Sequence, residues 1–228
     1  MRLGRAVIDL NADLGEGAAN DLSLLDLVSS ANIACGGHAG DPVLIRRTLE
    51  AARDRDVRIG AHPGYIDREH FGRRELNLTV ADVASQLHYQ VGGFLALARV
   101  VGVKVHYLKP HGALYNQAMR DETLARVVAA AAYLNGLELM GLPESQLEAA
   151  ASFLKIPYIR EGFADRRYAI DGSLVPRDQP DAFVHNAAEA CIQIERLIRE
   201  RGIQSICIHG DSPAAIMFAE AIRAKFET

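Results

Sequence analysis

Short runs rich in β-branched residues alternate with longer runs whose apolar residues recur at helical spacing, along the whole sequence. The predicted strands are Ala6–Asn11, Ser30–Ala34, Val57–Ala61, Val103–Leu108, Leu137–Leu142, Pro157–Arg160 and Ser205–His209. The predicted helices are Pro42–Arg55, Thr79–Val100, Asp121–Leu134, Ser145–Leu154, Ala187–Arg201 and Pro213–Phe226. Strands joined by crossover helices lie parallel. The alternation therefore predicts one α/β domain over residues 1–228, built on either a doubly wound sheet or a closed barrel.

The charge and composition of the chain narrow the class of its partners. Its 29 acidic and 25 basic residues are spread along the whole length, which argues against a nucleic-acid or membrane surface. No apolar stretch approaches the roughly 18 residues that span a bilayer, and the N-terminus has no signal-peptide pattern. The three cysteines lack CxxC spacing, which suits reduced thiols. We expect a cytoplasmic protein that binds a small molecule.

Polar residues gather where the predicted strands end, which is where parallel α/β folds place their functional loops. Asp9, Asn11 and Asp13 are two residues apart and share one face, before a turn at Gly15 and the carboxylate of Glu16. Such carboxylates could hold a hard cation or act as acid and base. They could also merely cap the turn. Acidic side chains that cluster in this way favour the functional interpretation.

A glycine-rich loop, Cys35–Asp41, connects the second predicted strand to a helix. Backbone amides that lead into a helix N-terminus suit a phosphate or a carboxylate, so Gly36 and His38 are candidate ligand contacts. A loop of this kind can also serve only as a tight connection. Asp41 is expected to be the N-cap of the helix.

Four of the eight histidines, His38, His62, His111 and His209, lie just past predicted strands. Scattered core packing does not readily produce this pattern, so it predicts a shared pocket. Imidazoles there suit metal binding or proton transfer. Lys109 and His111 share one face of an extended segment, where a positive charge beside an imidazole would stabilise developing negative charge.

Arginines near these strand ends have two interpretations. Arg73 and Arg74 could clamp a carboxylate or phosphate, or could form a solvated surface pair. Asp165 and Arg166 could form a local ion pair, and Asp211 could cap the last helix.

Seven sequence blocks resemble the LamB/YcsF family, in one order and almost end to end. They are Ile8–Gly17, Ser30–Pro42, Ile59–Arg74, Lys109–Asn116, Glu161–Tyr168, Leu174–Arg177 and Ile206–Pro213. The resemblance implies a distorted parallel (β/α) barrel, seven-stranded, related to polysaccharide-deacetylase-like barrels. It also implies a reaction in which ATP, water and 5-oxo-L-proline give L-glutamate, ADP and phosphate, carried out with separate subunits B and C. Phosphorylation of the lactam oxygen would activate a resonance-stabilised amide. The sequence has no Walker A motif, so ATP would bind in some other arrangement or depend on the partners.

The resemblance and the residue chemistry together give candidate roles. The predicted catalytic residues are Asp13, Glu16, Lys109, His111 and Asp211, with Asp211 or Glu16 as the base. The predicted substrate or phosphate contacts are Asn11, Asn32, Gly36, His38, Arg73, Arg74, Asn116, Asp165, Arg166, Arg177 and His209. A divalent metal, Mg²⁺, is expected on Asp13, His38 and His62.

The chain also differs from the family pattern near the expected site. The segment after Gly17 and a stretch before Ser205 are short, and Gly37 stands where a phenylalanine is usual. Two alternative functions follow: a metal-dependent amide hydrolase or deacetylase that needs no ATP, and a non-catalytic subunit that binds a small carboxylate.

Overall fold

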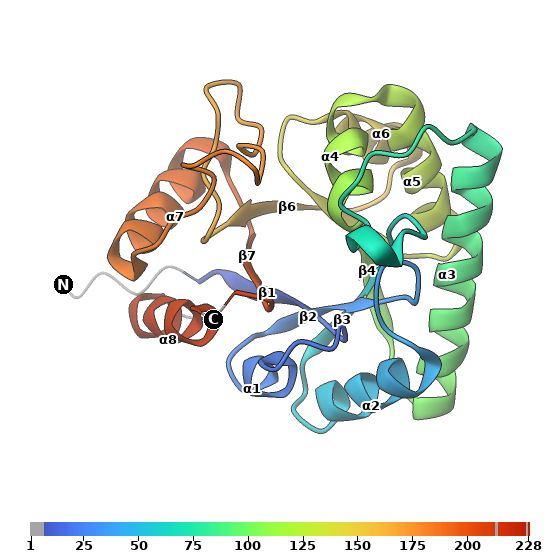
Figure 1. The fold of residues 1–228 in the computed structure, drawn as a ribbon, viewed down its shortest axis with the longest axis horizontal. Coiled ribbons are helices and arrows are strands. Elements are labelled where there is room, and N and C mark those ends of the chain that lie inside the picture. The colour runs from blue at the N-terminus through green and yellow to red at the C-terminus, as the bar shows by residue number, and fades with distance from the viewer. Residues whose placement is uncertain (1–6, 213, 227) are drawn as a thin grey trace.

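Seven parallel strands close into a barrel in the order β1 to β7, with β7 pairing back to β1 (Figure 1). The structure is a computed structural model and describes residues 7–212, 214–226 and 228. The strands are β1 Asp9–Leu14, β2 Ser30–Ala34, β3 Arg58–His62, β4 Val105–Leu108, β5 Glu138–Gly141, β6 Tyr158–Phe163 and β7 Ser205–His209. The predicted parallel barrel is confirmed, and the doubly wound alternative is wrong.

Two strands, β1 and β6, extend three residues beyond their predicted ends, and β3 extends one residue, to His62. β1 ends at Leu14, three residues later than expected, and Ala6 of the predicted strand lies outside the described residues. β6 continues through Glu161 to Phe163. Both extensions carry acidic side chains that face the barrel interior, and these resemble loop residues when only hydrophobicity is considered.

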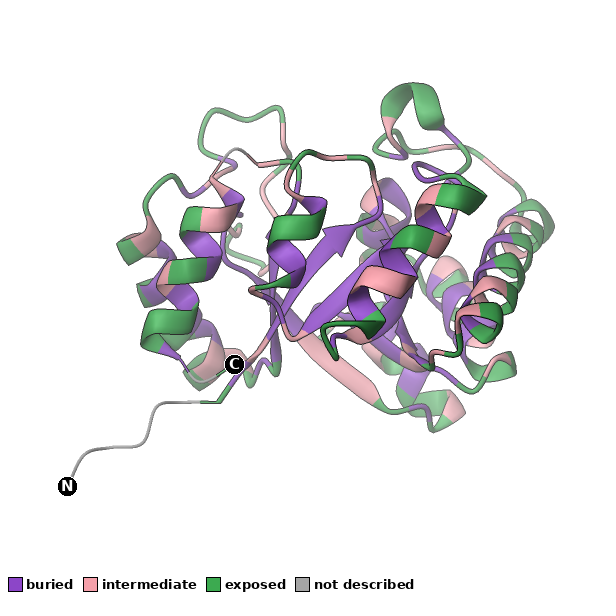
Figure 2. Ribbon diagram, turned by 90° about the horizontal axis from the view of Figure 1, so that it is seen from below, coloured by how far each residue is buried: buried purple, intermediate pink, exposed green. Residues whose placement is uncertain are grey.

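Helices surround the barrel and bury their apolar sides against it (Figure 2). They are α1 Asp21–Leu25, α2 Pro42–Arg53, α3 Val80–Val101, α4 Gly112–Arg120, α5 Glu122–Leu134, α6 Gln146–Leu154, α7 Ala187–Arg201 and α8 Ala215–Lys225, with a 3-10 turn at Arg68–His70. The six predicted helices are present, although Pro213, the predicted start of the last one, lies outside the described residues. α1 and α4 were not predicted, because α1 is too short for a period and α4 follows directly on a strand-end motif.

Helix capping matches the sequence signals. The Asp41 carboxylate accepts hydrogen bonds from the amides of Val43 and Leu44, and the Thr79 side chain accepts one from the amide of Asp82. These caps fix where α2 and α3 begin, and with them the ends of the loops that reach the barrel mouth.

The barrel interior is polar, whereas branched apolar residues usually fill such barrels. Asn11 donates to Ser205 Oγ, Asn32 donates to the side-chain oxygens of Asn11 and Asp13, and Tyr107 donates to Asn32. Apolar residues of the same strands, such as Leu10 and Ala12, point outward under the helices. Within the described residues, every helix is too short or too polar to cross a lipid bilayer.

Candidate active site

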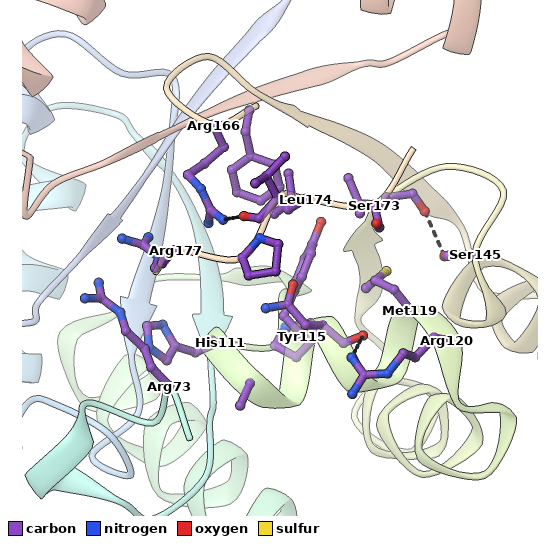
Figure 3. A pocket seen from close by; sticks show the side chains of 18 of the residues that line it. Arg73, His111, Tyr115, Met119, Arg120, Ser145, Arg166, Ser173, Leu174 and Arg177 are labelled. Carbon is purple, nitrogen blue, oxygen red and sulfur yellow. Dashed lines mark hydrogen bonds between the residues drawn. The ribbon is translucent and has the colours of Figure 1, made fainter. Parts of the chain in front are cut away.

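A cavity of about 750 Å³ opens at the carboxyl ends of the strands, with segment 171–178 forming part of its wall (Figure 3). The residues predicted for the site that line it are Asp13, His62, Arg73, Lys109, His111, Asn116, Arg166, Arg177 and His209. Residues remote in sequence therefore meet at one mouth of the barrel, as the strand-end pattern predicts.

Lys109 forms the charged floor of this cavity. Its Nζ lies 2.9 Å from Asp13 Oδ1, 2.7 Å from Glu161 Oε1 and 3.1 Å from Cys207 Sγ, and the side chain is 1% exposed. Burial alone would lower the pKa of Lys109, but Asp13, Cys207 and Glu161 raise it well above its usual value. Lys109 is thus a fixed positive charge that is held by buried carboxylates.

Asp13 is the carboxylate that links this floor to the histidines. Its Oδ2 lies 3.4 Å from His62 Nε2. Burial would raise the pKa of Asp13, yet the neighbouring His62 and Lys109 hold it well below the usual value. Asp13 is therefore ionised and engaged on both sides.

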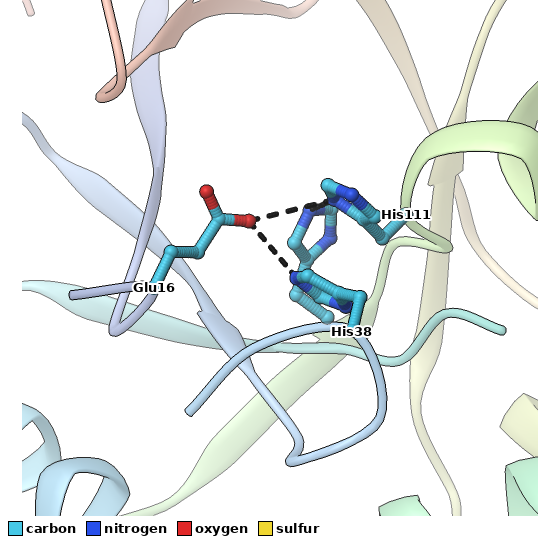
Figure 4. Close-up of side chains that lie close together, drawn as sticks. Glu16, His38 and His111 are labelled. Carbon is cyan, nitrogen blue, oxygen red and sulfur yellow. Dashed lines mark hydrogen bonds and ion pairs between the residues drawn. The ribbon is translucent and has the colours of Figure 1, made fainter. Parts of the chain in front are cut away.

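Three imidazoles and one carboxylate converge beside the cavity (Figure 4). The ligand atoms of Glu16, His38, His62 and His111 all lie within 4.8 Å of one another. Glu16 Oε1 is 3.0 Å from His38 Nε2 and 3.5 Å from His111 Nδ1, and His111 Nδ1 is 3.0 Å from His62 Nε2. We call these four residues the histidine cluster.

Glycine makes the close packing of this cluster possible. The His38 and His111 rings stack with centroids 3.6 Å apart. Gly72 lies against this stack at φ +63°, where a Cβ would come within 2.8 Å of His38 Cβ. Only glycine accepts both the backbone conformation and the contact.

Hydrogen bonds fix the tautomers of two of these imidazoles. His62 Nδ1 lies 2.8 Å from the carbonyl oxygen of Lys109, and His111 Nε2 lies 2.9 Å from that of Phe71. Carbonyl oxygens only accept, so both of these nitrogens carry protons. In the neutral rings, His62 Nε2 and His111 Nδ1 then present lone pairs to each other across 3.0 Å. A cation between them removes that conflict.

The histidine cluster therefore fits a divalent metal ion. Burial lowers the pKa of His38 and of His111 well below the usual value, which keeps both rings in the form that binds metals. Burial and the nearby Asp13 raise the pKa of Glu16, so a cation beside this carboxylate would stabilise its ionised form. His38 and His62 were predicted as ligands. Asp13 was also predicted, but it lies outside the group of four, which contains Glu16 and His111 instead.

His209 and Asp165 form a second pair of interest on the same cavity. His209 Nδ1 lies 2.9 Å and 3.0 Å from the two carboxylate oxygens of Asp165. Burial would raise the pKa of Asp165, but His209 lowers it, so the carboxylate accepts and Nδ1 donates. His209 Nε2 makes no hydrogen bond to a described residue and is free for proton transfer at the cavity. The predicted local ion pair between Asp165 and Arg166 does not form.

Several predicted site residues lie elsewhere. Asp211 pairs with Arg73, Nη2 to Oδ2 at 2.5 Å, and does not line the cavity. Arg74 is 56% exposed and lies 3.5 Å from Asp67, so the predicted Arg73–Arg74 clamp does not form. Asn11 and Asn32 belong to the polar interior of the barrel and do not line the cavity.

The glycine-rich loop before α2, residues 35–41, does not line the cavity. Arg68 donates to the carbonyl oxygens of Gly36 and Gly40, and Asp41 takes the first free amides of α2. The predicted anion contact at Gly36 thus gains no support from the arrangement of this loop.

The position of Gly37 is explained by a residue that sequence reasoning missed. A Cβ on Gly37 would lie 2.3 Å from Gln90 Oε1, so the Gln90 side chain from α3 fills the space beside this glycine. Gln90 is 2% exposed; its Oε1 accepts from the amide of Gly64 at 3.1 Å, and its Nε2 donates to the Gly64 carbonyl at 2.7 Å. A polar residue within the apolar stripe of α3 was the available signal. Gln90 thus packs against the loop that precedes His38 and is hydrogen-bonded to the loop that follows His62.

We predict that Gln90→Leu weakens divalent metal binding by about tenfold, since removal of an outer hydrogen-bond partner costs roughly 10- to 100-fold in affinity. Titration with Zn²⁺ against a competing chelator measures this. The exposed Gln179→Leu is the matched control and should bind like wild type. Unchanged affinity in Gln90→Leu, with the fold intact, would contradict a positioning role.

Glu161 is another residue whose part was not predicted. It is fully buried within β6, pairs with Lys109 and accepts from Tyr115 Oη at 3.0 Å. Its position just after a predicted strand could have pointed to it, but its partner Lys109 follows a different strand and could be identified only from the structure of the closed barrel.

Comparison with known proteins agrees with this geometry. Residues 8–228 match the LamB/YcsF family. A Neisseria meningitidis serogroup C protein, named as the A subunit of 5-oxoprolinase, is 48% identical over 230 residues, which cover 95% of this chain and 94% of that one. The crystal structure of a lactam utilization protein from Thermus thermophilus has a TM-score of 0.85 at 34% identity, covering 96% of both chains. The catalytic domain of a peptidoglycan N-acetylglucosamine deacetylase from Eubacterium rectale shares the fold alone, with a TM-score of 0.53 at 10% identity over 98% of this chain and 85% of that chain. The family match over nearly the whole chain shows that this protein belongs to the LamB/YcsF family.

Proposed function

We propose that this chain opens the ring of 5-oxo-L-proline to give L-glutamate, as the A component of a 5-oxoprolinase that also needs subunits B and C and ATP. The names of its relatives support a hydrolase that acts on a cyclic amide. The observation that carries the proposal is that His62 and His111 of the histidine cluster line the same cavity as His209, which is paired with Asp165.

The chemistry of ring opening matches these two groups. After ATP has phosphorylated the lactam oxygen, water must lose a proton as it adds to the activated carbon, and the ring nitrogen must gain one as the C–N bond breaks. The acyl phosphate so formed is then hydrolysed to L-glutamate and phosphate. Asp165 holds His209 with Nε2 toward the cavity, where it can accept the first proton and return it to the leaving nitrogen. Glu16, His38, His62 and His111 would hold a divalent ion, which supplies Lewis acidity toward a carbonyl or water when bound.

Lys109 then has an indirect role in the proposal. Its ammonium group is engaged by Asp13 and Glu161, so it sets the charge of the cavity floor and keeps Asp13 ionised beside His62. This differs from the direct stabilisation of developing negative charge that the sequence suggested for Lys109.

The donor set bears on which metal would bind. Imidazole nitrogens suit Zn²⁺, Fe²⁺ or Co²⁺, whereas Mg²⁺ prefers oxygen ligands and water. We therefore propose a transition-metal ion at the histidine cluster and reserve Mg²⁺ for the phosphates of ATP, whose binding we assign to the assembly with subunits B and C.

The test is glutamate release from 5-oxoproline, measured with the chain, subunits B and C, ATP, and each component omitted in turn. We expect glutamate only from the complete mixture, with loss on chelation and recovery on adding Zn²⁺ or Co²⁺. Glutamate formation without ATP or partners would favour the alternative of a simple metal-dependent amide hydrolase, which the histidine cluster also suits. Binding of 5-oxoproline without turnover in the complete mixture would favour a non-catalytic subunit.

A further inference from the structure

Two arginines of the segment between β6 and α7 line the cavity. Residues 164–186 connect β6 to α7 and fold back on themselves, with antiparallel bridges that join Arg166 to Phe183 and Tyr168 to Leu174. Arg166 and Arg177 both line the cavity, and Figure 3 shows them with Arg73 along one side of it.

Arg166 is a buried cation without a carboxylate partner among the described residues. It is 4% exposed, and its guanidinium donates to the carbonyl oxygens of Ala182 and Val175. Carbonyl groups satisfy its hydrogen bonds but leave its charge uncompensated. The adjacent Asp165 carboxylate is used by His209.

Arg177 adds a second unneutralised charge. Its guanidinium makes no ion pair or hydrogen bond with a described residue, and it lies over the Phe183 ring at 5.4 Å from the centroid. Arg166 lies over the same ring at 5.3 Å. Burial, together with Arg177, lowers the pKa of Arg166 to about 10, and burial with Arg73 lowers the pKa of Arg177. Arg166 and Arg177 thus place two guanidinium groups without ion-pair partners among the described residues beside one cavity, where a bound anion would be stabilised.

We propose that Arg166 and Arg177, spaced by Phe183, form a carboxylate subsite that orients the substrate in the cavity. Guanidinium groups bind carboxylates with two parallel hydrogen bonds, which fixes orientation as well as charge. This inference rests on the proposed function, in which the anion is the ring carboxylate of 5-oxoproline. The lactam bond then lies toward His209 and the histidine cluster. The clamp predicted at Arg73 and Arg74 is thereby replaced by a pair on segment 164–186.

The test compares two ligands that differ in one group. Calorimetry on the full chain measures binding of 5-oxoproline and of 2-pyrrolidinone, the same ring without the carboxylate. In Arg177→Gln we expect 5-oxoproline to bind at least about tenfold more weakly, because a charged hydrogen bond is lost. Binding of 2-pyrrolidinone should not change. Arg199→Gln, on the outer surface of α7, is the matched control.

Two outcomes would overturn the subsite: wild-type affinity for 5-oxoproline in Arg177→Gln, or an equal loss for both ligands. Arg177→Lys keeps the charge without the planar group and should recover only part of the affinity, which separates recognition from misfolding. If wild type does not bind 5-oxoproline but binds glutarate, and Arg177→Gln weakens glutarate binding, the carboxylate subsite is supported and the proposed substrate is wrong.

Discussion

Replacement of His111 by alanine is expected to abolish glutamate formation by the complete enzyme, with a loss on the order of 10³-fold or more if the cluster supplies a Lewis-acidic metal. His111 contributes Nδ1 to the centre of the histidine cluster, 3.0 Å from His62 Nε2 and 3.5 Å from Glu16 Oε1. No other imidazole of the described residues can take this position, since His38 and His62 already fill the neighbouring ones.

The fold should survive this change. In the metal-free protein the loss of His111 relieves its lone-pair conflict with His62, while it removes the stacking contact with His38 and the hydrogen bond to the Phe71 carbonyl. Circular-dichroism melts in chelator should therefore be close for wild type and His111→Ala. At a Zn²⁺ concentration about 100 times Kd, wild type should gain about 2.7 kcal/mol in unfolding free energy, and the variant little.

The exposed His88→Ala on α3 is the matched control, and it should keep both turnover and the metal-dependent shift. Full turnover in His111→Ala would refute the part that the cluster has in the reaction. If His111→Ala instead unfolds at a much lower temperature than wild type in chelator, the main role of His111 is in stability.

Replacement of His209 by asparagine is expected to lower kcat by roughly 10²- to 10⁴-fold, the usual contribution of a general acid–base group. The asparagine amide can still donate to Asp165, as Nδ1 does at 2.9 Å, so the change removes mainly Nε2. Metal affinity should stay at the wild-type value, because His209 lies outside the histidine cluster.

A pH profile separates proton transfer from simple packing. If His209 transfers the proton, wild type and His209→Asn should differ in the shape of their pH profiles, whereas a packing role lowers kcat by the same factor at every pH. Asp165→Asn, which replaces the charged acceptor of His209 Nδ1 with a neutral amide, should reduce kcat in the same direction. Wild-type kcat in His209→Asn would assign proton transfer to another group.

The sequence carried enough information for the barrel and for most of the convergence. Strands β2 and β7 have their predicted bounds, and the histidines that follow strands do meet at one mouth. This works because parallel strands place their carboxyl ends together whatever their order.

Pairing inside the site was less predictable. Asp13 lies two residues after Asn11 on β1, so its side chain points into the barrel, where Lys109 binds it. Glu16 follows the turn at Gly15, and its side chain reaches His38. Residue spacing alone does not show which of these two carboxylates is the metal ligand, because that depends on the course of the chain after Gly15.

Contacts across the barrel depend on its closure. The Asp211 carboxylate binds Arg73, which is 138 residues away, and His209 binds Asp165, which is 44 residues away. Each of these side chains had an equally good local role in the sequence, as a cap or as a neighbouring ion pair. Only the three-dimensional arrangement decides between them.

Cobalt binding to the full chain tests the central claim that the histidine cluster holds a divalent metal ion. Titration of metal-free protein with Co²⁺ should show one ion per chain and visible absorption bands of a nitrogen- and oxygen-ligated site, both lost in the His62→Ala, His111→Ala double variant. Absence of binding, or binding with the same spectrum in the double variant, would contradict it.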